Sequence, residues 1–284
     1  MYEPMGPMLR AARKGGYAVL AVNALNLETA ATVVAAAERA RSPIVINLYE
    51  GHLRAHLPGL QLIDGTRRMA EAASVPVAVG IDHGKDEAHV RRMIHAGFSS
   101  VMMDASERPF EENAAVVRRT VEFATAYGAS VEAEVGGMGA TAGGRFTTED
   151  MMTDPGQAAR FAALTGVDAL AVSYGSSHGE LPPGYTPALR FDRLAEISAR
   201  CALPLVLHGG SGTSPEDLAR SVELGISKVN MGADFMRANV RGFVEAYRAA
   251  PDAELVDLLA AAHAEAAAVA LRYLEPCGSV GRAR

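Results

Sequence analysis

The sequence lacks the features of secreted and membrane-spanning proteins. Its 284 residues contain only two cysteines, Cys201 and Cys277, which lie far apart and form no CxxC pattern. Two such thiols do not predict a disulfide framework and favour a reducing compartment, so we expect a cytoplasmic protein. Residues 1–14 contain no apolar stretch typical of a signal peptide. No run of about 18 apolar residues occurs, so no membrane span is predicted.

An excess of positive charge is missing as well. Against 33 acidic residues stand 27 lysines and arginines, a net charge of −6 at pH 7. This balance argues against nucleic acid or an anionic membrane as partner. Linkers and low-complexity segments that would mark a second domain are also absent from the sequence. Because 49% of the residues are hydrophobic, the chain can bury a sizeable core, and we expect residues 1–284 to form a single domain.

The sequence does contain a regular alternation of strand-like and helix-like segments. Short apolar, often β-branched runs predict parallel strands at 17–22, 43–48, 75–81, 100–103, 130–135, 169–172, 203–207 and 228–229. Helical spacing predicts helices at 27–40, 85–96, 110–127, 155–165, 192–200 and 214–224, and a long Ala-rich helical stretch within 235–274. Strands that alternate with helices indicate βαβ units, and eight such strands indicate closure. The predicted fold class is α/β, a single (β/α)8 TIM barrel.

Two connections are too long for simple turns. Residues 49–63 and 136–150 are both expected to be loops, and the second is rich in glycine and follows a strand directly. Long loops after barrel strands are usually functional lids.

Polar, ionisable and glycine residues follow the predicted strands. In such barrels the active site lies at the carboxyl ends of the strands, so the residues at these positions are the ones to compare. They are Asp82, His83 and Gly84 after the third strand, Asp104 after the fourth, Glu132 and Glu134 in the fifth, His178 after the sixth, His208 to Gly212 after the seventh and Asn230 to Asp234 after the eighth. Packing alone does not explain this convergence.

Three of the eight histidines, His83, His178 and His208, fall at strand ends with glycine immediately after them. Any one of them could be a hydrogen-bonded core histidine. Three at one rim instead predict a catalytic zinc site, which uses three protein ligands and an open position. His52 and His56 lie in the first long loop and read as a solvated surface pair.

Carboxylates accompany these histidines. Asp82 is placed for proton transfer beside a metal, although an acid there could also simply cap the strand. Asp104 and Glu134 could hold a second cation or orient the histidines, and salt bridges inside the barrel would explain them equally well.

Glycine-rich turns follow the seventh and eighth strands, the place where many barrels bind phosphate. The first turn contains Gly209, Gly210 and Ser211, and the second contains Asn230, Gly232 and Ala233. Backbone N–H groups in such turns favour anions. Each turn taken alone would equally suit an ordinary tight turn.

With these residues at these positions, the chain resembles the class II aldolases, the zinc-dependent fructose-bisphosphate and tagatose-bisphosphate family. The resemblance covers nearly the whole chain, and several motifs occur in order with the family's spacing. They are Asn23-Ala-Leu-Asn26, Ser42-Pro43, Asp82-His83-Gly84, Gly97 to Ser106, Val131-Glu-Ala-Glu134-Val-Gly136, Thr153-Asp-Pro155, Thr165-Gly-Val-Asp168, His178-Gly179, His208-Gly-Gly-Ser-Gly212 and Lys228-Val-Asn230.

The resemblance implies a role for each matching position. Asp82 matches the catalytic aspartate, and His83, His178 and His208 match the zinc ligands. Asp104 and Glu134 match a second metal site of some members. Gly179, Gly209, Gly210, Ser211 and Asn230 match residues that hold dihydroxyacetone phosphate. The implied reaction is reversible aldol cleavage without a Schiff-base lysine, and the implied assembly is a homodimer or homotetramer.

The chain also departs from the family pattern. Residues 139–144 lack the family's acidic cluster, for which Glu149 and Asp150 are the stand-in candidates. Ala233 replaces a threonine of the phosphate turn, and residues 180–185 lack a lysine that usually follows the His-Gly pair. Tyr49 brings a bulky aromatic side chain towards the rim of the barrel.

These departures leave three functions open. The first is a ketose-bisphosphate aldolase that uses dihydroxyacetone phosphate, and the second is a metal-dependent lyase or aldolase for a different or non-phosphorylated keto substrate. The third is a non-catalytic barrel that binds a metal or metabolite. Zinc is the expected metal, with cobalt, iron and manganese as alternatives for three imidazoles.

Overall fold

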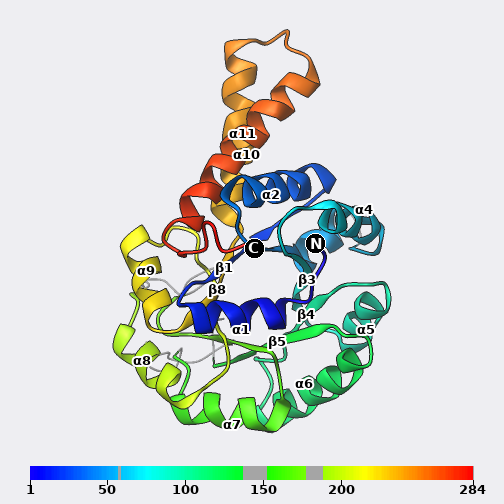
Figure 1. Cartoon of the computed structure of the whole chain (residues 1–284). Coiled ribbons are helices and arrows are strands. Elements are labelled where there is room, and N and C mark those ends of the chain that lie inside the picture. The colour runs from blue at the N-terminus through cyan, green and yellow to red at the C-terminus, as the bar shows by residue number, and fades with distance from the viewer. Residues whose placement is uncertain (57–58, 137–151, 177–187, 284) are drawn as a thin grey trace, which may run out of the picture.

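Eight parallel strands close into a barrel in the order β1 to β8, and helices surround it (Figure 1). The computed structural model describes residues 1–56, 59–136, 152–176 and 188–283. The strands are β1 (Val19–Asn23), β2 (Ile44–Tyr49), β3 (Val77–Gly84), β4 (Ser100–Met103), β5 (Ser130–Val135), β6 (Ala169–Val172), β7 (Leu205–Leu207) and β8 (Ile226–Met231). The predicted (β/α)8 TIM barrel is confirmed. Strands β4, β5 and β6 have the predicted bounds, whereas β3 and β8 extend further towards the rim.

Helices connect the strands, as expected. They are α2 (Leu27–Ala40), α5 (Glu87–His95), α6 (Phe110–Thr125), α7 (Pro155–Thr165), α8 (Phe191–Arg200) and α9 (Pro215–Glu223). Side chains cap several of their first turns. For example, Asp154 accepts a hydrogen bond from the Gln157 N–H, and Ser214 accepts one from the Asp217 N–H. Such caps satisfy backbone donors that have no partner inside the helix.

The expectation of a loop at residues 49–63 is wrong. Helix α3 (Glu50–Ala55) and the start of α4 (Gly59–Ala72) occupy this stretch. The cause is Glu50, a buried carboxylate that accepts a hydrogen bond from the Lys85 N–H at 3.0 Å and pairs with Arg54 one helical turn away. These contacts fasten α3 to the end of β3. The second predicted loop lies almost wholly outside the described residues.

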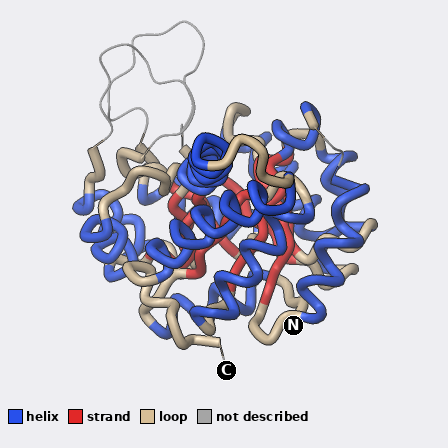
Figure 2. Tube along the Cα trace, turned by 90° about the horizontal axis from the view of Figure 1, so that it is seen from above, coloured by secondary structure: helices blue, strands red, loops and turns tan. Residues whose placement is uncertain are grey.

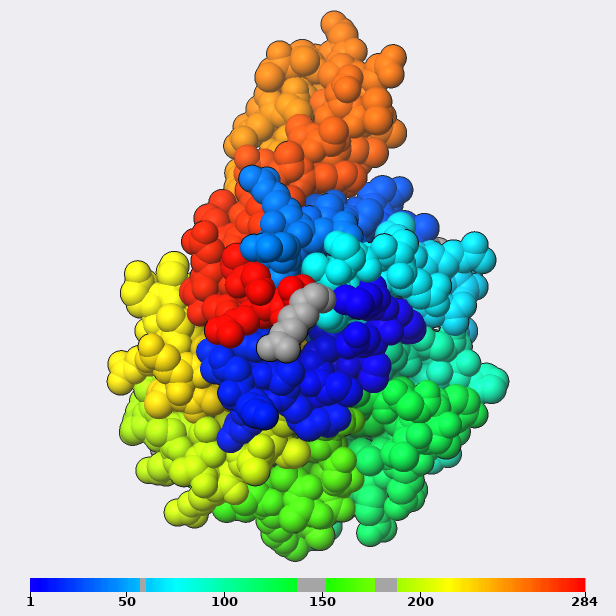
Figure 3. All heavy atoms as spheres, in the orientation of Figure 1, coloured from blue at the N-terminus to red at the C-terminus, as the bar shows by residue number. Residues whose placement is uncertain are grey.

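The long helical stretch predicted at the C-terminal end is two helices, α10 (Ala233–Ala249) and α11 (Leu255–Leu274). Pro251 comes two residues after the end of α10, and proline cannot continue a helix without losing a hydrogen bond. The two helices pack against each other and project from the barrel as a hairpin (Figures 1 and 3).

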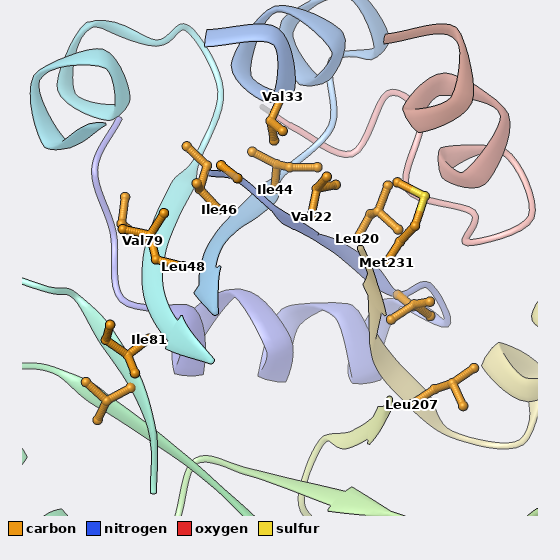
Figure 4. Packing of buried hydrophobic residues seen from close by; sticks show 14 of the residues in the cluster. Leu20, Val22, Val33, Ile44, Ile46, Leu48, Val79, Ile81, Leu207 and Met231 are labelled. Atoms are coloured by element: carbon orange, nitrogen blue, oxygen red, sulfur yellow. The ribbon is translucent and has the colours of Figure 1, made fainter. Parts of the chain in front are cut away.

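The strands present different residues to their two faces. Outward-facing residues such as Leu20, Ile46 and Val79 pack against the surrounding helices (Figure 4). A second cluster lies inside the barrel and combines small strand residues such as Ala21 and Ala78 with Met5, Met8 and Leu9. These last residues belong to α1 (Met5–Gly15), a helix that the sequence reading did not predict. It lies across the amino-terminal end of the barrel and closes it (Figures 1 and 3).

The opposite end of the interior is polar. Asp82, Glu132, His208, Lys228 and Asn230 are all buried, although they are charged or polar. Asp82, His208 and Asn230 lie at or near the carboxyl ends of β3, β7 and β8, and Glu132 and Lys228 lie midway along β5 and β8. Figure 2 shows the strands lying between the end of the barrel near the N-terminus and the opposite end. Within the described ranges, no helix has the length and hydropathy needed to cross a membrane.

Packing of the outer helices predicts a large effect for one core residue. Phe161 on α7 is fully buried and meets the Phe110 ring edge-on, with the ring centroids 5.7 Å apart. Phe161→Ala should lower the free energy of unfolding by about 3–5 kcal/mol, because it leaves a cavity in the core. Leu164→Ala is the matched control, since Leu164 lies on the same helix and is 42% exposed. Equal losses in the two variants, measured by denaturant unfolding, would contradict this packing.

Candidate active site

A pocket of about 620 Å³ opens at the polar end of the barrel. Its lining comes from the ends of β1, β2, β3, β7 and β8 and from the start of α10. The lining residues are Asn23, Tyr49, His52, Asp82, His83, His208, Gly209, Ser211, Asn230, Gly232, Ala233, Met236 and Arg237. The structure therefore brings together eight of the site residues predicted from the sequence. His178 and Gly179, together with Glu149 and Asp150, lie outside the described residues.

A bulge at the end of β3 lets neighbouring residues face the same pocket. The pairing of β3 with β4 shifts register between Ile81 and Gly84, and His83 adopts a φ of 53°, in the left-handed region. Consecutive side chains of a regular strand would point to opposite faces. The irregular backbone instead directs both Asp82 and His83 into the pocket. Such strained residues persist where the surroundings hold them in place, often at functional sites.

Two amide side chains hold the Asp82 carboxylate. Asn23 Nδ2 donates to Oδ2 at 3.2 Å, and Asn230 Nδ2 donates to Oδ1 at 3.2 Å. The two donors come from β1 and β8, which are neighbouring strands of the closed barrel. Both oxygens of Asp82 are thus positioned at the pocket wall, where a carboxylate can accept a proton from a bound hydroxyl group.

His83 and His208 turn one nitrogen each towards the other. His83 Nδ1 donates to Asp104 Oδ2 at 2.8 Å, and His208 Nε2 donates to Glu132 Oε1 at 2.8 Å. The remaining nitrogens, His83 Nε2 and His208 Nδ1, lie 3.0 Å apart. Because the carboxylates hold the outer N–H groups, the two lone pairs converge and need a cation or proton between them. This donor set fits a metal whose histidine ligands are oriented by carboxylates.

The charge around His83 supports the same conclusion. Burial lowers the pKa of the His83 imidazole, but the carboxylates of Asp82 and Asp104 raise it to about 9. One potential ligand atom from each of Asp82, His83 and His208 lies within 4.8 Å of the other two. A negative environment of this kind stabilises a bound divalent cation as well as a proton.

A second group of potential ligands lies behind His83. Ligand atoms of His83, Asp104 and Glu134 also fall within 4.8 Å of one another. Glu134 Oε2 is buried and has no hydrogen-bond partner among the described residues. Burial and the charge of Asp104 raise the pKa of Glu134 to about 8. An unpaired buried oxygen beside a second carboxylate suits a cation, and Asp104 also contacts the His83 ring.

Glu132 and Lys228 are functional candidates to which the sequence alone gave no role. The Lys228 Nζ donates to Glu132 Oε2 at 2.7 Å, and both side chains are almost fully buried. Burial alone would raise the pKa of Glu132, but the charge of Lys228 and the hydrogen bond from His208 lower it to about 2. The ionised carboxylate therefore fixes the His208 ring. The two-residue alternation in β5 and β8 was the available signal, since it places Glu132 and Lys228 on the inner face.

The glycine turns form one wall of the pocket. The Gly210 N–H donates to the Asn230 carbonyl at 3.0 Å, so this residue joins the two turns and does not line the pocket. A Cβ at Gly210 would lie 2.8 Å from that carbonyl oxygen, which explains why glycine is required. Gly209, Ser211 and Ala233 do line the wall.

Aromatic groups form another part of the pocket wall. The Tyr49 ring meets His83 edge-on, with centroids 6.0 Å apart, and meets His52 at 4.9 Å. Tyr49 thus reaches the rim as expected. His52 and His56 are exposed, but His52 also lines the pocket, which the surface-pair interpretation did not include.

A closed parallel barrel with a polar pocket at the carboxyl ends of its strands places this chain among the (β/α)8-barrel enzymes. The family follows from comparison with known proteins. The model of the class-II fructose-bisphosphate aldolases matches residues 3–282, so the chain belongs to this family and is an aldehyde-lyase.

Individual relatives cover nearly the whole chain. A probable fructose-bisphosphate aldolase of Bacillus subtilis is 37% identical over 251 residues, which is 87% of each chain. The D-tagatose-1,6-bisphosphate aldolase subunit GatY of Klebsiella oxytoca is 37% identical over an alignment that covers 97% of each chain. The crystal structure of the YdjI aldolase from Escherichia coli K12 is 31% identical, has a TM-score of 0.89 and is covered completely, as is this chain.

The buried pair behind His208 generates a prediction about metal affinity. Lys228→Met should lower the free energy of unfolding by about 3–5 kcal/mol, because it leaves the Glu132 charge buried without its partner. Glu132→Gln combined with Lys228→Met should restore much of this stability. Metal affinity should nevertheless stay about 10-fold below that of the unmodified protein, because the neutral amide no longer strengthens the His208 ligand.

Denaturant unfolding and metal titration separate these effects. Lys85→Met is the control, because Lys85 pairs with Glu107 at an exposed site. Unchanged metal affinity in the double variant would show that Glu132 and Lys228 only support the barrel.

Proposed function

We propose that this chain catalyses the reversible aldol cleavage and condensation of a ketose phosphate or bisphosphate, with dihydroxyacetone phosphate as the donor. The observation that carries the proposal is the Asp82 carboxylate, which two amides hold beside the converging nitrogens of His83 and His208. The enzyme would act as a single domain in the cytoplasm, which agrees with the buried, unpaired Cys201 and Cys277.

A divalent metal, zinc by its preference for imidazole nitrogen, would be held by His83 and His208, with His178 as the proposed third ligand. When bound, it supplies Lewis-acid polarisation of the substrate ketone. Asp104 and Glu134 would hold a second cation beneath His83.

The residues of the chain provide the remaining steps. Asp82 takes the proton from the carbinol hydroxyl during cleavage and returns it to the aldehyde oxygen during condensation. Asn23 and Asn230 keep this carboxylate in position. The turn residues Gly209, Ser211, Asn230, Gly232 and Ala233 bind the donor and its phosphate group, with Gly210 joining the two turns and Gly179 proposed to complete the set.

A second candidate substrate is a non-phosphorylated ketone. Ala233 favours it, because this pocket residue offers a methyl group and no hydroxyl donor to an anion. The two candidates share Asp82 and the histidines, so the substrate's phosphate group distinguishes them.

Proton–deuterium exchange at the hydroxymethyl carbon of dihydroxyacetone phosphate tests the proposal without a known aldehyde. The metal-loaded protein should catalyse exchange that a chelator abolishes. His208→Ala should lose both bound metal and exchange. Asp82→Ala should retain the metal and lose turnover in retro-aldol assays, by a factor of about 100 or more.

The outcomes discriminate among the candidates. Exchange with dihydroxyacetone but not with its phosphate would support the non-phosphorylated substrate. A metal-loaded protein that exchanges neither compound would contradict the proposed donor chemistry. Full turnover in Asp82→Ala would remove the assignment of the proton acceptor.

We also propose that the enzyme is a homodimer or homotetramer. Val240, Val244 and Tyr247 are spaced along one face of α10 and are 65%, 36% and 52% exposed. Leu255 and Val256 add further exposed apolar surface at the start of α11. Several exposed apolar side chains on a projecting hairpin are typical of a protein interface.

Light scattering tests the assembly. The unmodified protein should have two or four times the mass of the chain, and the combined change Val240→Glu with Val244→Glu should reduce the mass by placing charge in the contact. Val280→Glu is the control, because Val280 is 50% exposed but lies outside the hairpin. A monomeric unmodified protein, or an unchanged mass in the double variant, would contradict the interface.

A further inference from the structure

One positively charged side chain lines the pocket. Arg237 is the sole lysine or arginine among the pocket-lining residues of the described chain. It lies one helical turn after Ala233 on α10, and residues four positions apart share a helix face. Both residues line the pocket. The Ala233 methyl group provides no hydrogen-bond donor there, whereas the Arg237 guanidinium group does.

Asp234 connects Arg237 to the glycine turn. Its Oδ2 accepts hydrogen bonds from the Gly212 N–H at 2.9 Å and from the Tyr273 hydroxyl on α11. Its Oδ1 faces Arg237 Nη1 at 3.8 Å. This separation is too long for a hydrogen bond, so Asp234 attracts the guanidinium without using its donors. The carboxylate itself is held by groups from two other elements.

Other donors on this wall suit an anion. The Ser211 hydroxyl lies against the first turn of α10, where it accepts from the Asp234 N–H at 3.2 Å. The amino-terminal turn of a helix carries partial positive charge and unpaired N–H groups. A guanidinium has a planar pair of donors that matches two phosphate oxygens. The first turn of α10, the Ser211 hydroxyl and the Arg237 guanidinium thus belong to one part of the pocket lining and are linked through Asp234.

We propose that Arg237 binds the phosphate group of the substrate and sets the preference for phosphorylated over neutral ketones. The substrate class rests on the proposed function, whereas the anion preference of this wall does not. Because the Arg237 side chain is 78% exposed, the interaction is screened by salt. The phosphate preference should therefore weaken as ionic strength rises.

Arg237→Ala and Arg237→Lys test the assignment against Arg241→Ala. Arg241 lies one turn further along α10, pairs with Glu265 at 3.1 Å and is not among the residues lining the pocket. Arg237→Ala should raise KM for dihydroxyacetone phosphate exchange about 10-fold, as expected for one partly exposed charge-assisted contact. The kcat should change little, because Asp82 and the histidines are untouched.

The KM of Arg237→Lys for dihydroxyacetone phosphate should lie between those of Arg237→Ala and the unmodified protein, since lysine keeps the charge without the paired donors. The salt dependence of KM should also be smaller in Arg237→Ala. Exchange of unphosphorylated dihydroxyacetone should not change in any variant, and Arg241→Ala should match the unmodified protein throughout.

Calorimetric binding of glycerol 3-phosphate provides a reading that does not depend on turnover. Binding that is weakened in Arg237→Ala and retained in Arg241→Ala supports the assignment, even if the unmodified protein exchanges no dihydroxyacetone phosphate and the proposed donor fails. An unmodified protein that does not bind glycerol 3-phosphate overturns the assignment. Equal affinity and equal KM in Arg237→Ala and the unmodified protein overturn it as well.

Discussion

The buried charge of Glu132 constrains both the barrel and its pocket. A carboxylate removed from water needs partners of opposite charge or hydrogen-bond donors, since an uncompensated buried ion is costly. Lys228 and His208 provide these partners from β8 and from the residue after β7. The same contacts that make the charge tolerable also set the orientation of His208. The orientation of His208 therefore depends on closure of the barrel, because Glu132 and Lys228 meet only when β5 and β8 belong to the same closed sheet.

The rest of the site is arranged around a comparable constraint at β3. The register shift and the left-handed backbone of His83 are unfavourable for a residue with a side chain. Asp104 compensates by fixing the imidazole, and Ser106 holds Asp104 in turn through both its N–H and its hydroxyl group. Gly84 completes the turn, because a Cβ there would lie 2.8 Å from the Met102 carbonyl oxygen. The glycine after this histidine thus serves the close approach of β3 and β4, not the approach of a ligand.

Local sequence signals predicted most of this barrel. Alternation of apolar runs with helical spacing was sufficient for the strands and the connecting helices, because those patterns are local. Helix α3 escaped prediction because its stability depends on Glu50 reaching Lys85, a contact between distant residues. Helix α1 escaped for a similar reason, since Met5, Met8 and Leu9 are buried only after the barrel provides an interior surface.

The residues of the site also separate into those that local sequence signals predict and those that depend on contacts between distant residues. Asp82, His83 and His208 were recognisable because their residue types and strand-end positions both point to metal chemistry. Glu132 and Lys228 lie far apart in sequence, and neither reveals its partner until β5 and β8 are placed in the barrel. Arg237 was not distinguished from other helical arginines, because only the three-dimensional position of α10 brings it to the pocket.

The placement of α1 also bears on how this chain is made. The helix leaves the ribosome before the strands against which it packs, β1, β3, β5 and β8, and β8 is the last of the barrel strands to be synthesised. Its apolar face of Met5, Met8, Leu9 and Ala12 therefore has no complete surface to cover until β8 has emerged. Closure of the amino-terminal end of the barrel by α1 is therefore a late step of folding, and nascent chains expose this apolar face until β8 has been synthesised.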